Sequence, residues 1–184
     1  MTVALLQVST WDSQFIRALQ SHYTGSKGPP PGKKLAWRIV SGGRHIGWIG
    51  VGEPAYKLAP RRRLGLSDAR PLPGTVCCFM YRRETDAGVR GSDILRTYHN
   101  MARAEYWRRW NVEILHWETL VGPQCVKSEV AGACFRRVGY RSLGMTTGRT
   151  ARRPAGHSRG PRVWSDSTPK LVLYRGPLAR VVQE

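Results

Sequence analysis

The 184-residue chain is poor in acidic side chains, with 12 Asp and Glu against 30 Lys and Arg, which gives a formal net charge of +18 at pH 7. It has no apolar run near the roughly 20 residues that a membrane-spanning helix needs. Its first ten residues, MTVALLQVST, lack the basic start and long apolar stretch of a signal peptide. These absences predict a cytoplasmic protein that has no membrane partner.

Cysteine and histidine patterns that would indicate a metal site are also missing. The four cysteines are Cys77, Cys78, Cys125 and Cys134, and none forms a CxxC pair or a recognised zinc spacing with a histidine. The five histidines are scattered along the chain. We therefore predict no metal site, and free thiols in a reducing compartment.

Arginine is the residue that is present in excess. Of the 30 basic residues, 24 are arginine, whose planar guanidinium binds phosphate or a guanine edge at two points. A chain with this charge is expected to bind a phosphate polymer, since neutralised phosphates release counterions. The alternative is a basic surface without such a partner.

The basic residues are concentrated in two expected loops, at about 24–34 and 147–165, and in a run at 61–63. Residues 130–165 contain eight arginines and no acidic residue, which is typical of a nucleic-acid-binding surface. The predicted DNA contacts are Lys33, Lys34, Arg61, Arg62, Arg63, Arg149, Arg152 and Arg153.

Hydrophobic periodicity predicts one α/β domain over residues 1–184, with a central mixed sheet. The expected helices are 11–23, 92–109 and 126–138, and the expected strands are 35–40, 45–51, 75–81, 112–121, 140–146 and 170–175. The Ser41-Gly42-Gly43-Arg44 segment is typical of a tight turn between the first two strands. The predicted order is helix, hairpin, strand, helix, strand, helix and two strands. Within it, a hairpin followed by strand, helix, strand, helix and strand resembles the order of the GNAT acetyltransferase fold.

Several segments resemble a GNAT-related family of phage DNA-modification proteins, the Mom family. They are SHYTG (21–25), LAWRIVSGGRHIGWIG (35–50), WETLV (117–121), GACFRRVGYRSLGMTTGR (132–149) and TPKLVLYR (168–175). The resemblance implies a phage-encoded transferase that adds a small carbamoyl- or acyl-type group to adenine N6 in double-stranded DNA and so protects it from host restriction. The chain departs from the family near Cys134 or Phe135, where a Tyr is usual, and at Glu118, where Asp is common.

A donor site is expected at the start of the long helix, because aligned N–H groups there favour anions. In GNAT proteins this is where the pyrophosphate of coenzyme A binds, so an acyl-CoA-type donor is possible, although the resemblance leaves the donor unidentified. The candidates are Gly88, Arg90, Gly91 and Ser92. They do not reproduce the usual Q/R-x-x-G-x-G/A spacing, and a flexible turn with a helix cap is the alternative.

Four residues are candidates for acid–base chemistry. His22 and Tyr23 match the family's His-Tyr after the first helix and could move a proton, or they could end a helix packed on the sheet. Glu118 is expected in an apolar strand, where desolvation favours a general base; a structural ion pair with an arginine is the alternative. Ser128 is the last candidate, with an N-cap as its other role.

An enzyme that acts on adenine N6 must extract the base from the stack. Trp37, Trp48 and Tyr56 are the candidates for stacking on it, although hairpin tryptophans are often core residues. Two further functions stay open. One is a non-catalytic DNA-binding protein on a GNAT scaffold, and the other is an ordinary acyl-CoA-dependent N-acetyltransferase.

Overall fold

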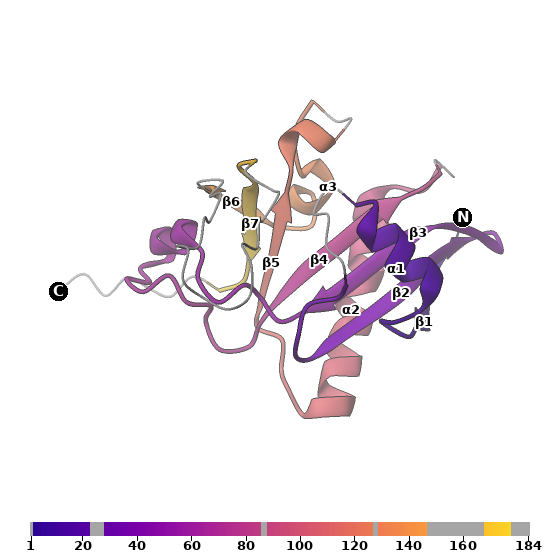
Figure 1. Cartoon of the computed structure of the whole chain (residues 1–184), viewed down its shortest axis with the longest axis horizontal. Helices are drawn as coiled ribbons and strands as arrows, with labels where there is room; N and C mark the ends of the chain where they lie inside the picture. Colours follow the sequence, from indigo (N-terminus) through magenta and orange to yellow (C-terminus); the bar gives the residue numbers. More distant parts are fainter. Residues whose placement is uncertain (1, 23–27, 86–87, 127–128, 147–167, 178–184) are drawn as a thin grey trace, which may run out of the picture.

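The computed structural model describes residues 2–22, 28–85, 88–126, 129–146 and 168–177, and they form one mixed seven-stranded sheet (Figure 1). The strand order across the sheet is β1-β2-β3-β4-β5-β7-β6. The strands are β1 (Val3–Val8), β2 (Lys34–Ser41), β3 (Arg44–Gly52), β4 (Thr75–Arg83), β5 (His116–Val121), β6 (Arg141–Met145) and β7 (Leu171–Arg175). β4 and β5 are parallel, and every other pair is antiparallel.

Helices cover both faces of this sheet. They are α1 (Ser13–Gln20), α2 (Gly91–Trp110) and α3 (Ala133–Arg136), with short 3-10 helices η1 (Ala59–Leu64) and η2 (Pro123–Cys125). The α2 face forms the main core around Tyr98 and Trp117. On the opposite face, α1 packs through Phe15 and η1 packs through Leu64. Among the described residues, no helix is long and apolar enough to cross a membrane.

The first helix is fixed by its cap and its apolar face. The Asp12 carboxylate accepts hydrogen bonds from the N–H groups of Gln14 and Phe15, at 2.9 and 3.0 Å, which satisfies two otherwise unpaired donors of the first turn. The helix ends at Gln20 instead of near His22. The sequence prediction also missed β1, an edge strand in which Leu5 alone is buried, because its hydrophobic alternation is weak.

The predicted hairpin is confirmed as β2 and β3. Gly42 and Gly43 both have positive φ, 55° and 75°, as the type of turn that suits the twist of a two-residue hairpin requires. Farther along β3, Gly50 leaves room for a side chain of β4. A Cβ at this position would lie 2.6 Å from Cζ of Phe79, so the Phe79 ring rests directly on the β3 backbone.

Two expected elements are shorter than predicted. The strand expected over 112–121 begins at His116, and the helix expected over 126–138 contains only Ala133–Arg136. Gly132 precedes this helix with φ 73°, a conformation that interrupts a right-handed helix. The long helix, expected over 92–109, is confirmed as Gly91–Trp110.

Candidate active site

A cleft of about 900 Å³ opens where β4 and β5 separate. The two strands pair only from Thr75 and His116 to Cys78 and Thr119. At that last pair, Thr119 Oγ1 donates a hydrogen bond to the Cys78 carbonyl oxygen at 3.0 Å. Beyond it β4 no longer pairs with β5, and Phe79, Met80 and Tyr81 of β4 line the cleft.

The start of α2 forms one wall of the cleft. Gly88, Arg90, Gly91 and Ser92 all line it, so the residues that were predicted to bind a donor lie together. A Cβ at Gly91 would be 2.9 Å from Tyr81 Oη and 3.0 Å from Cys134 Cβ, and glycine is what allows this close approach. The Asp93 N–H donates to the Arg90 carbonyl oxygen at 3.0 Å, whereas the N–H groups of Gly91 and Ser92 precede the first bond of the helix, and the helix dipole favours an anion there.

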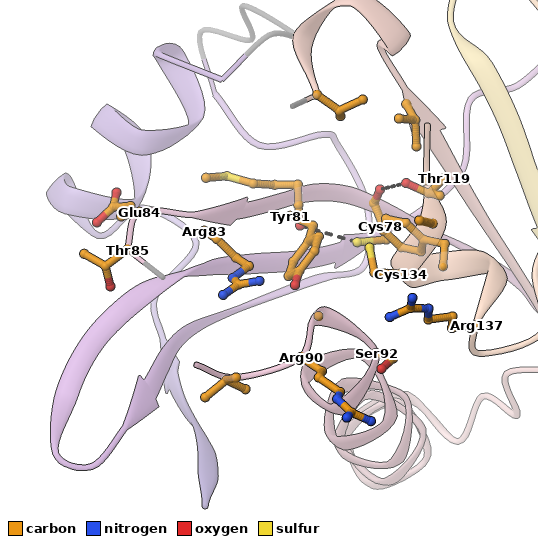
Figure 2. Close-up of a pocket in the computed structure, with 18 of the residues that line it drawn as sticks. Cys78, Tyr81, Arg83, Glu84, Thr85, Arg90, Ser92, Thr119, Cys134 and Arg137 are labelled. Carbon is orange, nitrogen blue, oxygen red and sulfur yellow. Dashed lines mark hydrogen bonds between the residues drawn. The ribbon is translucent and has the colours of Figure 1, made fainter. Parts of the chain in front are cut away.

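Tyr81 and Cys134 point into the same space from β4 and α3, with Arg83 and Arg137 on either side and Arg90 across from them (Figure 2). Burial is the largest cause that raises the pKa of both Tyr81 and Cys134. Both groups are therefore protonated at neutral pH. The Tyr81 hydroxyl is buried and has no hydrogen-bond partner among the described residues.

Most residues that line the cleft are uncharged, but the charged ones are mainly cationic. Glu84 is the one carboxylate among the described lining residues, and it is held by Nε2 of His45 at 2.7 Å, Nε1 of Trp48 at 3.2 Å and Nε of Arg82 at 3.9 Å. These contacts reduce its ability to repel an anion, while Arg83, Arg90 and Arg137 attract one. The electrostatics of the cleft favour a phosphorylated ligand.

His22 lies against the backbone of β4 but is not among the residues that line the cleft. It is buried and its ring hydrogen-bonds to the backbone of Tyr81. Burial, with smaller contributions from Arg82 and Lys170, lowers the pKa of His22 to about 4, so the ring is neutral at pH 7. The other two candidates in this part of the prediction, Tyr23 and Ser128, lie outside the described residues.

Glu118 does not face the cleft, which corrects the prediction that it is a general base. Arg61 Nε and Nη2 each donate to one Glu118 carboxylate oxygen, both at 2.7 Å. Arg61 also donates to the carbonyls of Ala55, Ala69 and Tyr56, at 2.8, 3.0 and 3.5 Å. Both side chains are buried, so the pair is a structural clamp between η1 and β5, as the alternative proposed.

The same contacts correct the prediction that Arg61 binds DNA, because its guanidinium has no exposed surface. The stacking prediction is wrong for Trp37 and Trp48, whose rings pack in the core against Tyr98 and Phe15. Of the other residues predicted to contact DNA, Tyr56, Arg62 and Arg63 are exposed, and Lys33 and Lys34 are partly exposed. Arg149, Arg152 and Arg153 lie outside the described residues. Of the two basic loops, 28–34 is described and 24–27 and 147–165 are not.

A second buried histidine predicts how stability depends on pH. His99 Nδ1 accepts from Arg175 Nη1 at 2.8 Å, and Nε2 lies 3.0 Å from Tyr140 Oη. Burial and then Arg175 lower the pKa of His99 to about 3. Below pH 6.5 this residue and His22 become protonated in the unfolded chain but not in the folded chain. The part of the free energy of unfolding that depends on their neutral form is therefore complete above pH 6.5 and is lost as the pH falls toward 3.

Urea unfolding at pH 7, 5.5 and 4.5 measures this effect. We expect the free energy of unfolding to fall steadily across this series. His99→Gln should be less stable at pH 7 but should show a shallower decline, because it removes one of the histidines that take up protons on unfolding. An unchanged pH dependence in this variant would contradict the assignment.

Comparison with known proteins identifies the fold. No family model matches the chain, and no curated protein does. Among solved structures, a Bacillus subtilis acetyltransferase in complex with CoA matches with a TM-score of 0.55 at 9% identity, over 96% of this chain and 100% of that one. The aminoglycoside acetyltransferase AAC(6')-Ib in complex with coenzyme A matches with a TM-score of 0.54 at 13% identity, over 95% of each chain.

The chain has the GNAT acetyltransferase fold. The fold predicted from the order of the elements is therefore confirmed. Tyr81, Arg83, Cys134 and Arg137 were not among the predicted site residues of this GNAT scaffold. The predicted strand 75–81 and helix 126–138 contained Tyr81 and Cys134, but nothing in the sequence indicated that they face each other.

Proposed function

We propose that the protein transfers an acyl-type group from an acyl-CoA-type donor to adenine N6 in double-stranded DNA. The observation that supports such a donor is the cationic cleft between β4 and β5, which lies against the amino end of α2. Structural neighbours that bind CoA have the same fold. The phage and anti-restriction setting follows from the Mom resemblance and is part of the same proposal.

The residues of the cleft fit such a donor. The N–H groups at Gly91 and Ser92, with Arg90, Arg83 and Arg137, suit its phosphates. The backbone of β4 beyond Cys78, which does not pair with β5, suits its amides. A thioester donor would supply the activated carbonyl carbon. As N6 bonds to this carbon, the C–S bond would break and the thiolate of CoA would leave.

The acceptor side needs a group that takes a proton, because the lone pair of adenine N6 is delocalised into the ring. His22 is neutral at pH 7 and contacts the backbone of Tyr81, so we assign it this role. A pKa near 4 makes it a weak base, which suits a group that orients the amine and accepts its proton only as the new bond forms. The net charge of +18 supports a polyanionic acceptor and disfavours a polycationic one such as an aminoglycoside.

Mass spectrometry of nucleosides tests this proposal. Purified protein, duplex DNA and acetyl-CoA should yield an acyl adduct of adenine, and His22→Gln should reduce its yield roughly a hundredfold, the scale of losing one acid–base group. Calorimetry with CoA measures donor binding separately, and His22→Gln should leave it unchanged. If the protein binds CoA but forms no adenine adduct, the proposal that adenine is the acceptor is wrong. If it does not bind CoA, the proposal of an acyl-CoA-type donor is wrong.

A further inference from the structure

The connection between β3 and β4 is much longer than the sheet requires. These strands are antiparallel neighbours, which two residues are enough to join. Here β3 ends at Gly52 and β4 begins at Thr75, so 22 residues, 53–74, lie between them. Figure 1 shows this segment with η1 beside β6 and β7, at the far end of the sheet from the β2–β3 turn.

The segment is anchored firmly to the sheet. Leu64 packs against Leu143, Val172 and Tyr174 on β6 and β7. Arg61 fixes it a second time through its two hydrogen bonds to Glu118 and three to backbone carbonyls of the same segment. The backbone that carries its outer side chains is therefore held in place by a buried network.

The outer face of the segment carries an aromatic ring and four cations, which we call the cationic platform: Tyr56, Lys57, Arg62, Arg63 and Arg70. Tyr56 is 64% exposed, with the Arg70 guanidinium 5.1 Å and the Lys57 ammonium 5.9 Å from its ring centre. Such contacts hold cations beside an aromatic ring. Tyr56 therefore gathers two positive charges at one place.

The other two cations extend the platform toward β6. A Cβ at Gly144 would lie 3.1 Å from the Arg63 guanidinium, so Arg63 lies across this edge strand. No carboxylate among the described residues pairs with Arg62 or Arg63. Asp68 pairs with Arg70 at 3.2 Å, on the exposed surface, where such a pair is weak and leaves Arg70 able to contact a phosphate.

We propose that the cationic platform docks the phosphate backbone of duplex DNA. This inference rests on the proposed function, in which DNA is the acceptor. Guanidinium groups bind phosphate through two parallel hydrogen bonds, and cations held in place by a rigid segment lose little freedom when they bind. The platform positions the duplex without reading its sequence, since phosphate contacts carry no base information.

A matched pair of double variants tests the platform. Arg62→Ala/Arg63→Ala removes two of its charges, and Arg17→Ala/Arg44→Ala removes two exposed charges from α1 and the β2–β3 turn. The affinity for a fluorescent duplex is measured by anisotropy between 50 and 200 mM salt. We expect the platform variant to bind about tenfold more weakly, with a logarithmic salt slope smaller by about 1.8, from roughly 0.9 per phosphate contact. The control should keep the wild-type slope.

Tyr56 gives a second test that does not change the charge. Tyr56→Ala removes the ring beside Lys57 and Arg70 and should weaken binding several-fold, whereas Tyr56→Phe retains the ring and should bind more tightly than Tyr56→Ala. Circular dichroism verifies that each variant is folded. Equal affinities of Tyr56→Ala and Tyr56→Phe would contradict the role of the ring.

The outcomes separate this inference from the proposed function. Wild-type protein that binds CoA but not DNA would overturn the acceptor, and the platform with it. Wild-type protein that binds and modifies DNA, with the two double variants equal in affinity and salt slope, would overturn the platform alone. Weaker binding restricted to one DNA sequence would also overturn it, because the platform would then be reading bases.

Discussion

Glu118→Gln should lower the free energy of unfolding by about 3–5 kcal/mol, the usual cost of removing one partner from a buried ion pair. Arg61 would keep its charge in a fully buried position without a carboxylate to balance it. Urea unfolding at pH 7 measures the effect. Folded Glu118→Gln protein at low temperature should still bind CoA, since Glu118 does not line the cleft.

The double variant Arg61→Met/Glu118→Leu is the control. Removing both charges should recover part of the lost stability. The recovery should be incomplete, because the carbonyls of Ala55 and Ala69 lose the donors that Arg61 supplied. A Glu118→Gln protein as stable as the wild type, yet unable to modify DNA, would show that Glu118 is catalytic after all.

Gly91→Asp should abolish donor binding and reduce acyl transfer by a hundredfold or more. The new Cβ would lie within 3.0 Å of both Tyr81 Oη and Cys134 Cβ. The carboxylate would also place a negative charge where the start of α2 favours the donor's phosphates. Calorimetry with CoA should give no heat, while affinity for duplex DNA should remain within a fewfold of the wild type.

Two comparisons separate the charge from the crowding. Gly91→Ala introduces the Cβ without the charge and should weaken CoA binding less than Gly91→Asp does. Arg137→Ala, which removes a cation of the cleft, should weaken it about tenfold, whereas Arg136→Ala, on the neighbouring exposed position outside the cleft, should have no effect. Equal effects of the two arginine variants would place the donor elsewhere.

The sequence predicts well those elements whose signals are local. The long helix and the β2–β3 hairpin were found within a few residues, because helical periodicity and a Gly-Gly turn are each contained in one segment. The helix predicted over 126–138 is mostly absent, and the cause is a glycine within the predicted range. Gly132 adopts a positive φ, and the apolar residues on its two sides do not share one helix.

The residues of the site also differ in whether a local signal in the sequence predicts them. The glycines before the long helix predict the anion-binding wall of the cleft at Gly88–Ser92, because the N-terminus of a helix favours anions. The position of Tyr81 opposite Cys134 arises only when β4, α2 and α3 assemble. The partner of Glu118 lies 57 residues away in the chain. The residues around Glu118 are therefore compatible with both a base and a clamp, and they do not decide between the two.

The residues proposed to contact DNA and the residues proposed to bind the donor belong to different segments of the chain. The cleft is built by β4, β5, α2 and α3, while the platform belongs to residues 53–74, which attach through Arg61 and a few apolar contacts. Evolution or engineering can therefore replace the outer residues of this segment without altering the cleft. An exchanged segment that retains Arg61 and Leu64 but carries acidic residues outside would redirect the same transfer chemistry toward cationic acceptors.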